Sequence, residues 1–483
     1  MATMRMADEE AGAWSYKGEG AANIVLEYIG ANPALVGKVL RLRKTLRDHK
    51  IKNTISEKAP VLINIEQSIW ADWPDVASAT TTEILQHAYV KDVMLPLLGK
   101  EYVDTGVPVA ISQNFLAAVA QNIQEKRPIW RQENADVDLL SPLALLISDH
   151  TKFSILPGVR EKVQSTIAVE IKPKCGFLPT TTTMDPANVV KKDVSRFAMH
   201  QHLKYMEGKL KSISSYSPLD LFSGTSEGIY HAIESLFRTP QNNLRVFIDG
   251  TKLFSGVGEG AKAEVECMRD DEGVLQIIED SLEGFIPLPL GERFKTLQAL
   301  ITELLYRSDM LNRLLAVQKL DNYDIEGAIH IYYDILETKC NVCLSSSQLS
   351  GKRVDDVASM TFVKGEQLTV NSSLHNDMKN QQTEAVAQLH SLSVEEKKKI
   401  IRDFLIAATA KDCSIILALQ PVSSFTDERS IICCPVTKQQ YFYKMFFLDL
   451  DLKRLKKLPF YHELDQKIVS YYAHSQASRT ISS

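Results

Sequence analysis

The chain has 483 residues, of which 45% are hydrophobic and 24% charged, as is ordinary for a globular protein. Its formal net charge is −5, so the total charge points neither to nucleic acid nor to an anionic membrane, and any anion site must be local. No apolar run reaches the roughly 18 residues of a membrane helix, the N-terminus lacks the apolar core of a signal peptide, and the seven cysteines lack disulfide-framework spacing.

Residues 13–44 predict three strands, the first two joined by a glycine-rich turn. The turn, GEGAAN (18–23), lies between two strands rather than between a strand and a helix. This position disfavours a dinucleotide or Walker loop and favours the hairpin that kinases fold over nucleotide phosphates. Arg41, on the third strand, would reach the same phosphates. A plain tight hairpin is the alternative for this stretch taken alone.

A strand that ends in charge is predicted around residues 169–174. Glu170, Lys172 and Lys174 alternate, so a strand would point all three to one face. An ion pair with Glu170 would need only one lysine, so the second lysine indicates an additional anionic partner. Before this point, residues 90–122 read as mostly helical, and residues 139–150 as a buried strand or helix.

Helices dominate the prediction for the middle of the chain. Residues 196–205 place Arg196, His200 and Lys204 on one helical stripe, and 225–238 form another helix, followed by a loop and a strand. Residues 292–336 predict two helices broken near Asn322, and 344–389, rich in Ser, Gln and Asn, a mobile insertion.

Three acids follow this region in positions typical of phosphotransferases. Ser393 opens a capped helix over 394–410, and Asp412 then lies between that helix and a buried strand. Asp449 and Asp451 end a later strand. A carboxylate beside a hydroxyl nucleophile and a strand-end magnesium ligand would have this arrangement. The alternative is that these acids only cap loops.

Basic residues from distant segments would bind a highly anionic small molecule if they converge, and would otherwise be ordinary solvated side chains. Cys340 and Cys343, with His330 before them, have the spacing of three ligands of a structural zinc, although two buried or redox thiols are the alternative. The fourth ligand is His375 or His390, and the nearby helix start favours His390.

Several motifs together resemble the inositol-pentakisphosphate 2-kinases, most closely the plant form, from Trp14 to about Tyr472. These enzymes make inositol hexakisphosphate (phytate) from ATP and the pentakisphosphate. EIKPK is the most specific motif. The matching stretches are GEGAAN (18–23), EIKPKCGFLP (170–179), RFAMHQHLK (196–204), PQNNLRVF (240–247), LIAATAKDCSI (405–415) and FLDLDLK (447–453).

The resemblance implies an α+β, two-lobed fold distantly like that of protein kinases, with an enlarged C-terminal lobe. We place the N-terminal lobe at 1–148 and the C-terminal lobe, with the catalytic and inositide sites, at 149–483. The resemblance also implies magnesium, a structural zinc, and an ATP-dependent transfer of phosphate to the 2-hydroxyl of inositol 1,3,4,5,6-pentakisphosphate.

Roles follow from the resemblance, residue by residue. Asp412 would act beside the reacting hydroxyl, Lys172 would assist the transferring phosphate, and Asp449 would bind magnesium. The residues matched to the nucleotide site are Gly20, Asn23, Val39, Arg41, Asp149, His150 and Glu170. Those matched to the inositide site are Arg131, Lys174, His200, Lys204, Asn242, Asn243, Lys453, Lys457 and Tyr461. The zinc ligands would be His330, Cys340, Cys343 and His390.

Leu46, followed by Arg47, stands where the plant pattern carries a basic residue, which puts one phosphate contact of the first lobe in doubt. The rival functions are a non-catalytic inositol-phosphate sensor on a kinase scaffold and a zinc-dependent interaction module. For the enzyme we expect a soluble monomer of the cytoplasm, the nucleus or both, not secreted, with a small-molecule substrate and neither nucleic acid nor membrane as a partner.

Overall fold

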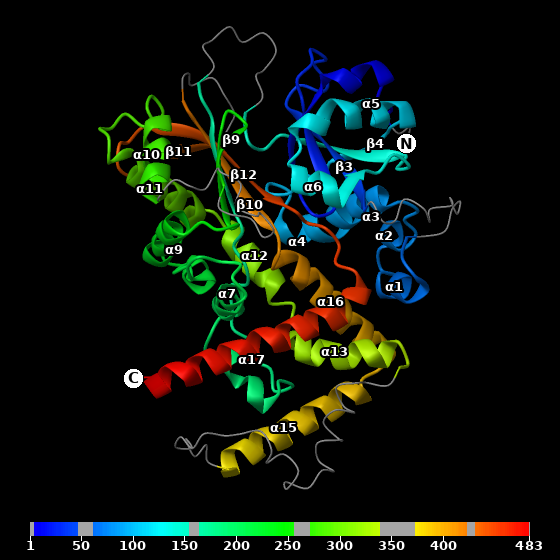
Figure 1. The fold of residues 1–483 in the computed structure, drawn as a ribbon. Helices are drawn as coiled ribbons and strands as arrows, with labels where there is room; N and C mark the ends of the chain where they lie inside the picture. Colours follow the sequence, from blue (N-terminus) through cyan, green and yellow to red (C-terminus); the bar gives the residue numbers. More distant parts are fainter. Residues whose placement is uncertain are drawn as a thin grey trace.

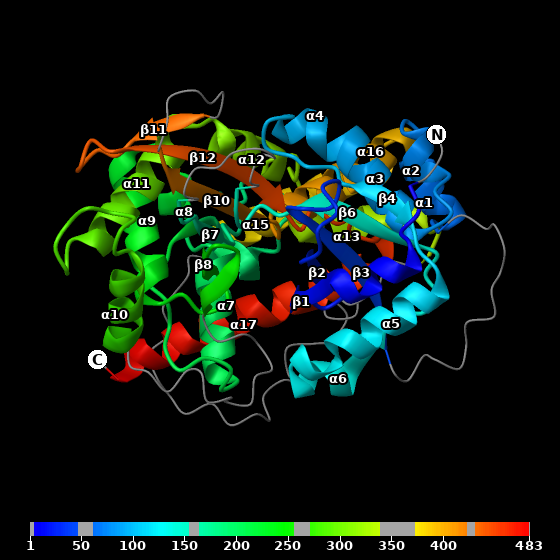
Figure 2. The ribbon, with the colours of Figure 1, turned by 90° about the horizontal axis from the view of Figure 1, so that it is seen from above.

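The computed structural model describes residues 4–46, 61–153, 164–255, 271–338, 372–422 and 430–482. The fold is α+β, with two antiparallel sheets that lie side by side and helices around both (Figures 1 and 2). None of the helices in the described ranges is both long and apolar enough to cross a membrane.

The first sheet has the strand order β1-β2-β3-β6-β4, with β5 paired to β3. Alternating burial along β2 and β3 places Leu26, Leu40 and Leu42 in a core that helix α5 covers, so the three strands predicted over 13–44 are confirmed. Strand β4 was missed within the segment predicted as helical. The strands are β1 (Trp14–Glu19), β2 (Asn23–Tyr28), β3 (Lys38–Leu46), β4 (Val107–Ala110), β5 (Ala135–Val137) and β6 (Leu143–Ser148).

Helices precede and flank this sheet. A group near residues 64–98 packs its apolar side chains not on the first sheet but into the larger core that surrounds the second, as Trp70 and Tyr89 show. The helices are η1 (Asp8–Ala13), α1 (Asn64–Ile69), α2 (Pro74–Ala77), α3 (Thr82–Tyr89), the π-helix η3 (Val90–Met94), α4 (Leu95–Leu98), α5 (Gln113–Ile123), η4 (Gln124–Lys126) and α6 (Ile129–Asn134).

The second sheet has the order β11-β12-β10-β7-β8-β9, and every pairing is antiparallel. Strand β10 is buried along its whole length, as its apolar sequence predicts. The strands are β7 (Ile167–Ile171), β8 (Leu244–Ile248), β9 (Thr251–Ser255), β10 (Ser414–Pro421), β11 (Ile431–Cys433) and β12 (Gln440–Leu448).

Helices pack against the second sheet and extend below it in Figure 1. Ser393 accepts from the Glu396 N–H (3.3 Å), and Glu396 accepts from the Ser393 N–H (2.9 Å), which confirms the predicted capping box. The helices are η5 (Pro186–Lys192), α7 (Arg196–Met206), α8 (Pro218–Leu221), α9 (Ser226–Arg238), α10 (Asp271–Ser281), α11 (Arg293–Arg307), α12 (Met310–Gln318), α13 (Asp324–Ile335), α15 (Ser372–Ser391), α16 (Val394–Ala410), η8 (Leu455–Lys457) and α17 (Leu458–Ser482).

Two predictions about the elements are wrong, and the segment of a third holds a helix that was not predicted. The segment 292–336 holds three helices, because α11 ends at Arg307 and α12 begins at Met310. The expected mobile insertion 344–389 includes most of helix α15, which lies beneath α13 in Figure 1; residues 344–371 lie outside the described residues. Strand β7 ends at Ile171, before both lysines, since Pro173 lacks an N–H and Lys174 has a φ of 63°.

Candidate functional site

Asp412 lies in the short turn between α16 and β10, and two lysines hold its carboxylate. Lys453 Nζ is 2.6 Å from Asp412 Oδ2, and Lys174 Nζ is 3.9 Å from Oδ1. Burial raises the pKa of Asp412, but Lys453, Lys174 and Lys172 outweigh it and hold the pKa below its ordinary value. The carboxylate, whose side chain is 57% exposed, is therefore ionised at neutral pH and accessible to a substrate.

The two lysines of EIKPK follow β7 as an irregular segment. The Lys172 N–H donates to the Asn243 carbonyl (2.8 Å), which fixes this segment to the start of β8. Burial, together with the charges of Lys172 and Lys204, lowers the pKa of Lys174 to about 8, against the opposing effect of Asp412. Cations from three segments thus crowd one space, an arrangement that an anionic ligand would relieve.

Acids at the end of β12 form a second centre. Asp449 has a φ of 60° and its residue is exposed, yet desolvation by the surrounding protein raises its pKa. The Glu170 carboxylate raises that pKa further, while Lys172 and Arg41 lower it. Asp451 forms an ion pair with Arg41, which joins β3 of the first sheet to this strand end. Carboxylates that repel one another beside cations are suited to a divalent metal and phosphates.

Arg245 belongs to this centre and was missed by sequence reasoning. It lies directly opposite Glu170 in the β7–β8 pairing, and its Nη1 is 3.1 and 3.0 Å from the two carboxylate oxygens. Glu170 and, more weakly, Asp449 raise the pKa of Arg245. PQNNLRVF was noted for its asparagines, and only the strand register reveals that its arginine faces Glu170.

In the glycine hairpin, hydrogen bonds hold the Gly20 carbonyl, while the space beside the Gly20 Cα is open. The Gly20 carbonyl accepts from Arg131 Nη1 (3.2 Å) and Lys44 Nζ (3.0 Å). The Asn23 amide oxygen accepts from Arg41 Nε (3.0 Å) when the amide is oriented to satisfy both groups. A Cβ at Gly20 would meet nothing within 4 Å, so the space beside this backbone is free for another molecule.

The segment after β6 connects the sheets through charged groups. The Asp149 carboxylate accepts from Lys17 Nζ (3.0 Å), and its carbonyl accepts from Lys444 Nζ on β12 (3.0 Å). The His150 ring stacks on Phe446 with ring centroids 3.9 Å apart, and burial lowers its pKa, so the ring is neutral. Val39, on β3, is 8% exposed. Base contact by Asp149, His150 and Val39 stays a prediction.

The residues matched to an inositide site are brought together in part. Lys204 and Lys172 act electrostatically on Lys174, and Lys453 and Asp412 act on Tyr461, so these side chains share one neighbourhood. Arg131 contacts the hairpin instead, and Lys457 lies over the ring of Phe460 (5.7 Å). The remaining members are half-buried His200 on α7, half-buried Asn242 and buried Asn243 just before β8.

Two of the four matched zinc ligands lie together. The rings of His330 and His390 have centroids 5.6 Å apart, and His390 Nδ1 is 2.9 Å from both carboxylate oxygens of Asp334. Burial, with His390 and His462, lowers the pKa of His330 to about 4, so its ring is in the neutral form that binds metals. Cys340 and Cys343 lie outside the described residues.

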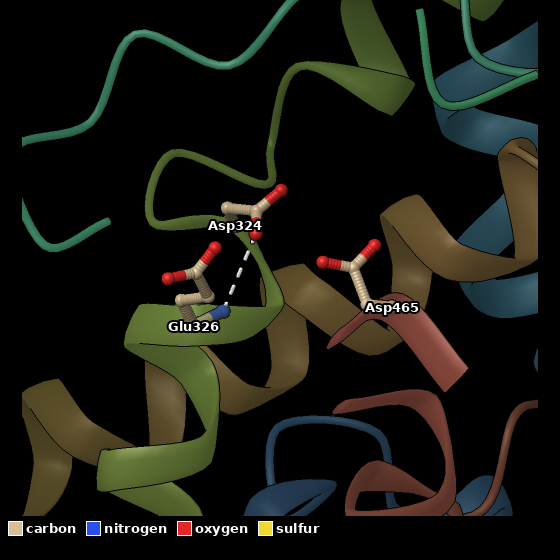
Figure 3. A group of neighbouring side chains, drawn as sticks. All are labelled: Asp324, Glu326 and Asp465. Carbon is tan, nitrogen blue, oxygen red and sulfur yellow. Dashed lines mark hydrogen bonds between the residues drawn. The ribbon is translucent and has the colours of Figure 1, made fainter. Parts of the chain in front are cut away.

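A separate acidic cluster has the spacing of a metal site but is bound by a lysine. Asp324 and Glu326 at the start of α13 and Asp465 on α17 surround one space (Figure 3). Lys191 Nζ forms ion pairs with Asp324, with Glu326 (2.9 Å) and with Asp465 (2.7 Å). An ammonium group therefore occupies the position that a cation would take, and the cluster joins η5, α13 and α17.

Replacing Lys191 by methionine should lower the free energy of unfolding by about 3–5 kcal/mol, because two buried carboxylates and the half-buried Asp324 would lose their common partner. Urea denaturation of wild type and variant measures the change. Lys192→Met is the matched control, since the described residues give Lys192 no ion pair, and it should change stability little. Equal stability of the two variants would contradict the role of the cluster.

The sequence is similar to that of known proteins along almost its whole length. The sequence model of the inositol-pentakisphosphate 2-kinase family matches residues 16–467. An inositol-pentakisphosphate 2-kinase of Arabidopsis thaliana is 39% identical over 475 residues, covering 98% of this chain and 96% of its own. The enzyme of Oryza sativa subsp. indica is 40% identical over 469 residues (96% and 94% covered), and that of Danio rerio 28% over 509 residues (96% and 93% covered).

Proposed function

Because the chain belongs to the inositol-pentakisphosphate 2-kinase family, we propose that it transfers the γ-phosphoryl group of ATP to the 2-hydroxyl of inositol 1,3,4,5,6-pentakisphosphate. The products would be ADP and inositol hexakisphosphate (phytate). The observation that carries this proposal is the contact of one ionised acid with two lysines, since Asp412 lies 2.6 Å from Lys453 and 3.9 Å from Lys174.

Asp412 would accept the proton of the attacking hydroxyl. Its pKa is below the ordinary value, so the carboxylate is ready as an acceptor at neutral pH. As the hydroxyl oxygen bonds to the γ-phosphorus, the bond from that phosphorus to the bridging oxygen of ATP breaks, and ADP takes the electron pair. Lys172, close to both Asp412 and Asp449, would offset charge on the transferring group.

The strand-end acids fit magnesium. Asp449 and Glu170 offer oxygen ligands and repel each other, and a divalent ion held by them would remove this repulsion. When bound, magnesium would neutralise part of the charge on the ATP phosphates. Arg41 and Arg245 lie around the same acids and would contact the ATP phosphates beneath the hairpin of Gly20.

The inositide would be held by charge geometry. Lys174, Lys204 and Lys453 lie near Asp412, so an inositol ring beside Asp412 would bring its phosphates to these ammonium groups. His200, Asn242, Asn243, Lys457, Tyr461 and Arg131 would complete the phosphate contacts. For Arg131 and Lys457 this requires movement away from their present partners, Gly20 and Phe460.

We propose that the two sheets belong to two kinase-like lobes, 1–148 and 149–483. The ion pair between Arg41 and Asp451 would then cross the nucleotide site, and the segment at Asp149 would be the hinge. The helices of 64–98 lie within the first range but share the core of the second sheet, so they would move with the C-terminal lobe.

The function is tested by incubating purified protein with ATP, magnesium and the pentakisphosphate, and identifying the product by NMR. We expect the product to be inositol hexakisphosphate that carries the new phosphate at position 2. Tight binding of the hexakisphosphate without turnover would support the non-catalytic sensor instead.

The affinity for the inositide should depend on pH through Lys174. Its pKa is about 8 in the free protein, so the side chain is charged below this pH and neutral above it. The kcat/KM for the pentakisphosphate should therefore be level below about pH 8 and decrease above it, towards tenfold per unit. Steady-state kinetics across pH 6.5–9.5 measure the profile. The Lys174→Met variant should lack this bend, and an unchanged bend in that variant would contradict the assignment.

We propose a structural zinc bound by His330, His390, Cys340 and Cys343. The contact of Asp334 with His390 Nδ1 supports this proposal, because metal-bound histidines commonly donate their second nitrogen to a carboxylate.

Elemental analysis of protein prepared without chelators should find about one zinc per chain. Cys340→Ser should lose the metal and lower the melting temperature, whereas Cys433→Ser, which alters an exposed cysteine elsewhere, should keep it. Absence of zinc from the wild type would contradict the site.

A further inference from the structure

One buried side chain bonds to both segments that carry the candidate catalytic residues. Gln318, the last residue of α12, is 0% exposed. Its Nε2 donates to the Lys174 carbonyl (2.8 Å) and to the Ala410 carbonyl (3.2 Å), and its Oε1 accepts from the Gly176 N–H (2.8 Å). Ala410 ends α16, two residues before Asp412, so a single amide spans the segment after β7 and the turn of the catalytic acid.

The chemistry of these contacts requires an amide. Two carbonyls and one N–H face the side chain, and only a group with two donor hydrogens and an acceptor oxygen satisfies all three. The three backbone groups belong to irregular segments and to a helix end, where no strand or helix partner is available to them. Loss of the amide would therefore take this partner from the Lys174 carbonyl and the buried Gly176 N–H, whereas the Ala410 carbonyl would keep the Cys413 thiol at 3.3 Å.

The hydrogen bonds of Gln318 help to fix the distance between Lys174 and Asp412, which matters for the reaction. Lys174 has a φ of 63°, an uncommon conformation that its surroundings must hold, and its Nζ reaches Asp412 Oδ1 at 3.9 Å. A second contact supports the same junction, since Lys411 Nζ is 2.6 Å from Asp321 Oδ2, just after Gln318. The end of α12 thus holds both sides of the candidate active site, and the loop that follows it holds the Asp412 side a second time.

We propose that Gln318 is a positioning residue that sets the relation of Lys174 to Asp412 without contacting substrate. This inference rests on the proposed kinase function. A misplacement of reacting groups by about 1 Å costs on the order of 10²-fold in rate. Loss of the amide should therefore slow the transfer to the inositide. It should leave ATP binding nearly unchanged, because Arg41, Arg245 and the glycine hairpin lie on other elements.

The test is Gln318→Met, which keeps the length and volume of the side chain and removes its hydrogen bonds. We expect kcat for the pentakisphosphate to decrease by about 10²-fold, while KM for ATP stays within about threefold. The matched control is Gln420→Met on β10. Gln420 is 8% exposed, its Nε2 donates to the Gln164 carbonyl (2.7 Å), and it lies about 20 Å from the Asp412 end of the strand. Both variants should lose thermal stability, but only Gln318→Met should lose kcat.

A second variant, Gln318→Glu, should have an activity that depends on pH, which would not be expected if Gln318 acted only through packing. A neutral carboxyl can still accept from Gly176 and donate to one carbonyl, whereas an ionised one cannot donate. Because burial raises the pKa of a carboxyl, the activity of this variant relative to wild type should increase as pH falls from 8 to 6.

The role of Gln318 would be overturned if a folded Gln318→Met protein had the kcat of the wild type. It would also be overturned if the activity of Gln318→Glu relative to wild type did not change with pH. Both comparisons require an active wild type. An inactive wild type would instead contradict the proposed function, so the two failures are distinguishable.

Discussion

Asp412→Asn should lower kcat for the pentakisphosphate by about 10³-fold, within the 10²–10⁴-fold range of general-base catalysis. Asparagine keeps the size of the side chain, but it cannot take a proton. The Lys453 ammonium, 2.6 Å from the carboxylate in the wild type, would lose its partner, and its charge would then favour binding of the anionic substrate. KM for the pentakisphosphate should therefore stay level or decrease while kcat falls, and single-turnover kinetics with labelled ATP measure the chemical step.

The control for this variant is Asp403→Asn. Asp403 lies on α16, the helix that precedes Asp412, and pairs with Lys399 at 2.6 Å. Exposed pairs of this kind contribute little, so kcat should be that of the wild type. A wild-type chemical rate in Asp412→Asn would remove Asp412 from the mechanism and leave its contact with the lysines as a structural ion pair.

Lys174→Met should raise KM for the pentakisphosphate by about 10- to 100-fold, because a hydrogen bond to a charged group contributes about 1.5–3 kcal/mol. KM for ATP should change by less than about threefold, since the phosphates of ATP would lie against Arg41, Arg245 and the hairpin. Methionine keeps the Cβ and the apolar stem, so the strain at the φ of 63° stays the same. Initial rates with each substrate varied in turn separate the two constants.

Lys319→Met is the matched control for Lys174→Met. Lys319 is an exposed lysine at the end of α12 that forms no ion pair within the described residues, and both KM values should be unchanged in its variant. Equal losses for the two substrates in Lys174→Met would show that this lysine belongs to a region shared by both.

The local features of the candidate site could be predicted from sequence because they depend on neighbouring residues. The alternation around the glycine turn predicted the β1–β2 hairpin, and the capping box at Ser393 predicted the start of α16. The acid at Asp412 was thereby placed between a helix and a strand, as the structure has it. Asp449 was likewise placed at a strand end.

Other features depend on contacts between distant segments. Lys172 and Lys174 were expected on a strand face, but the chain leaves the strand at Ile171, and Lys174 turns through a positive φ that no alternation pattern contains. Arg245 reaches Glu170 only through the register of β7 with β8. Lys191 meets its carboxylates only when three helices pack together. The resemblance to a family implied a common site for the matched basic residues, but it named neither Arg245 nor Lys191.

The most direct test of the central claim is a structure of the complex with a non-hydrolysable ATP analogue, magnesium and the pentakisphosphate. We expect the 2-hydroxyl oxygen within about 3 Å of an Asp412 oxygen, with Lys174 and Lys453 on the flanking phosphates and the γ-phosphorus in line beyond it. An inositide bound away from Asp412, or one that presents another position of the ring to it, would contradict the role of Asp412 as the proton acceptor.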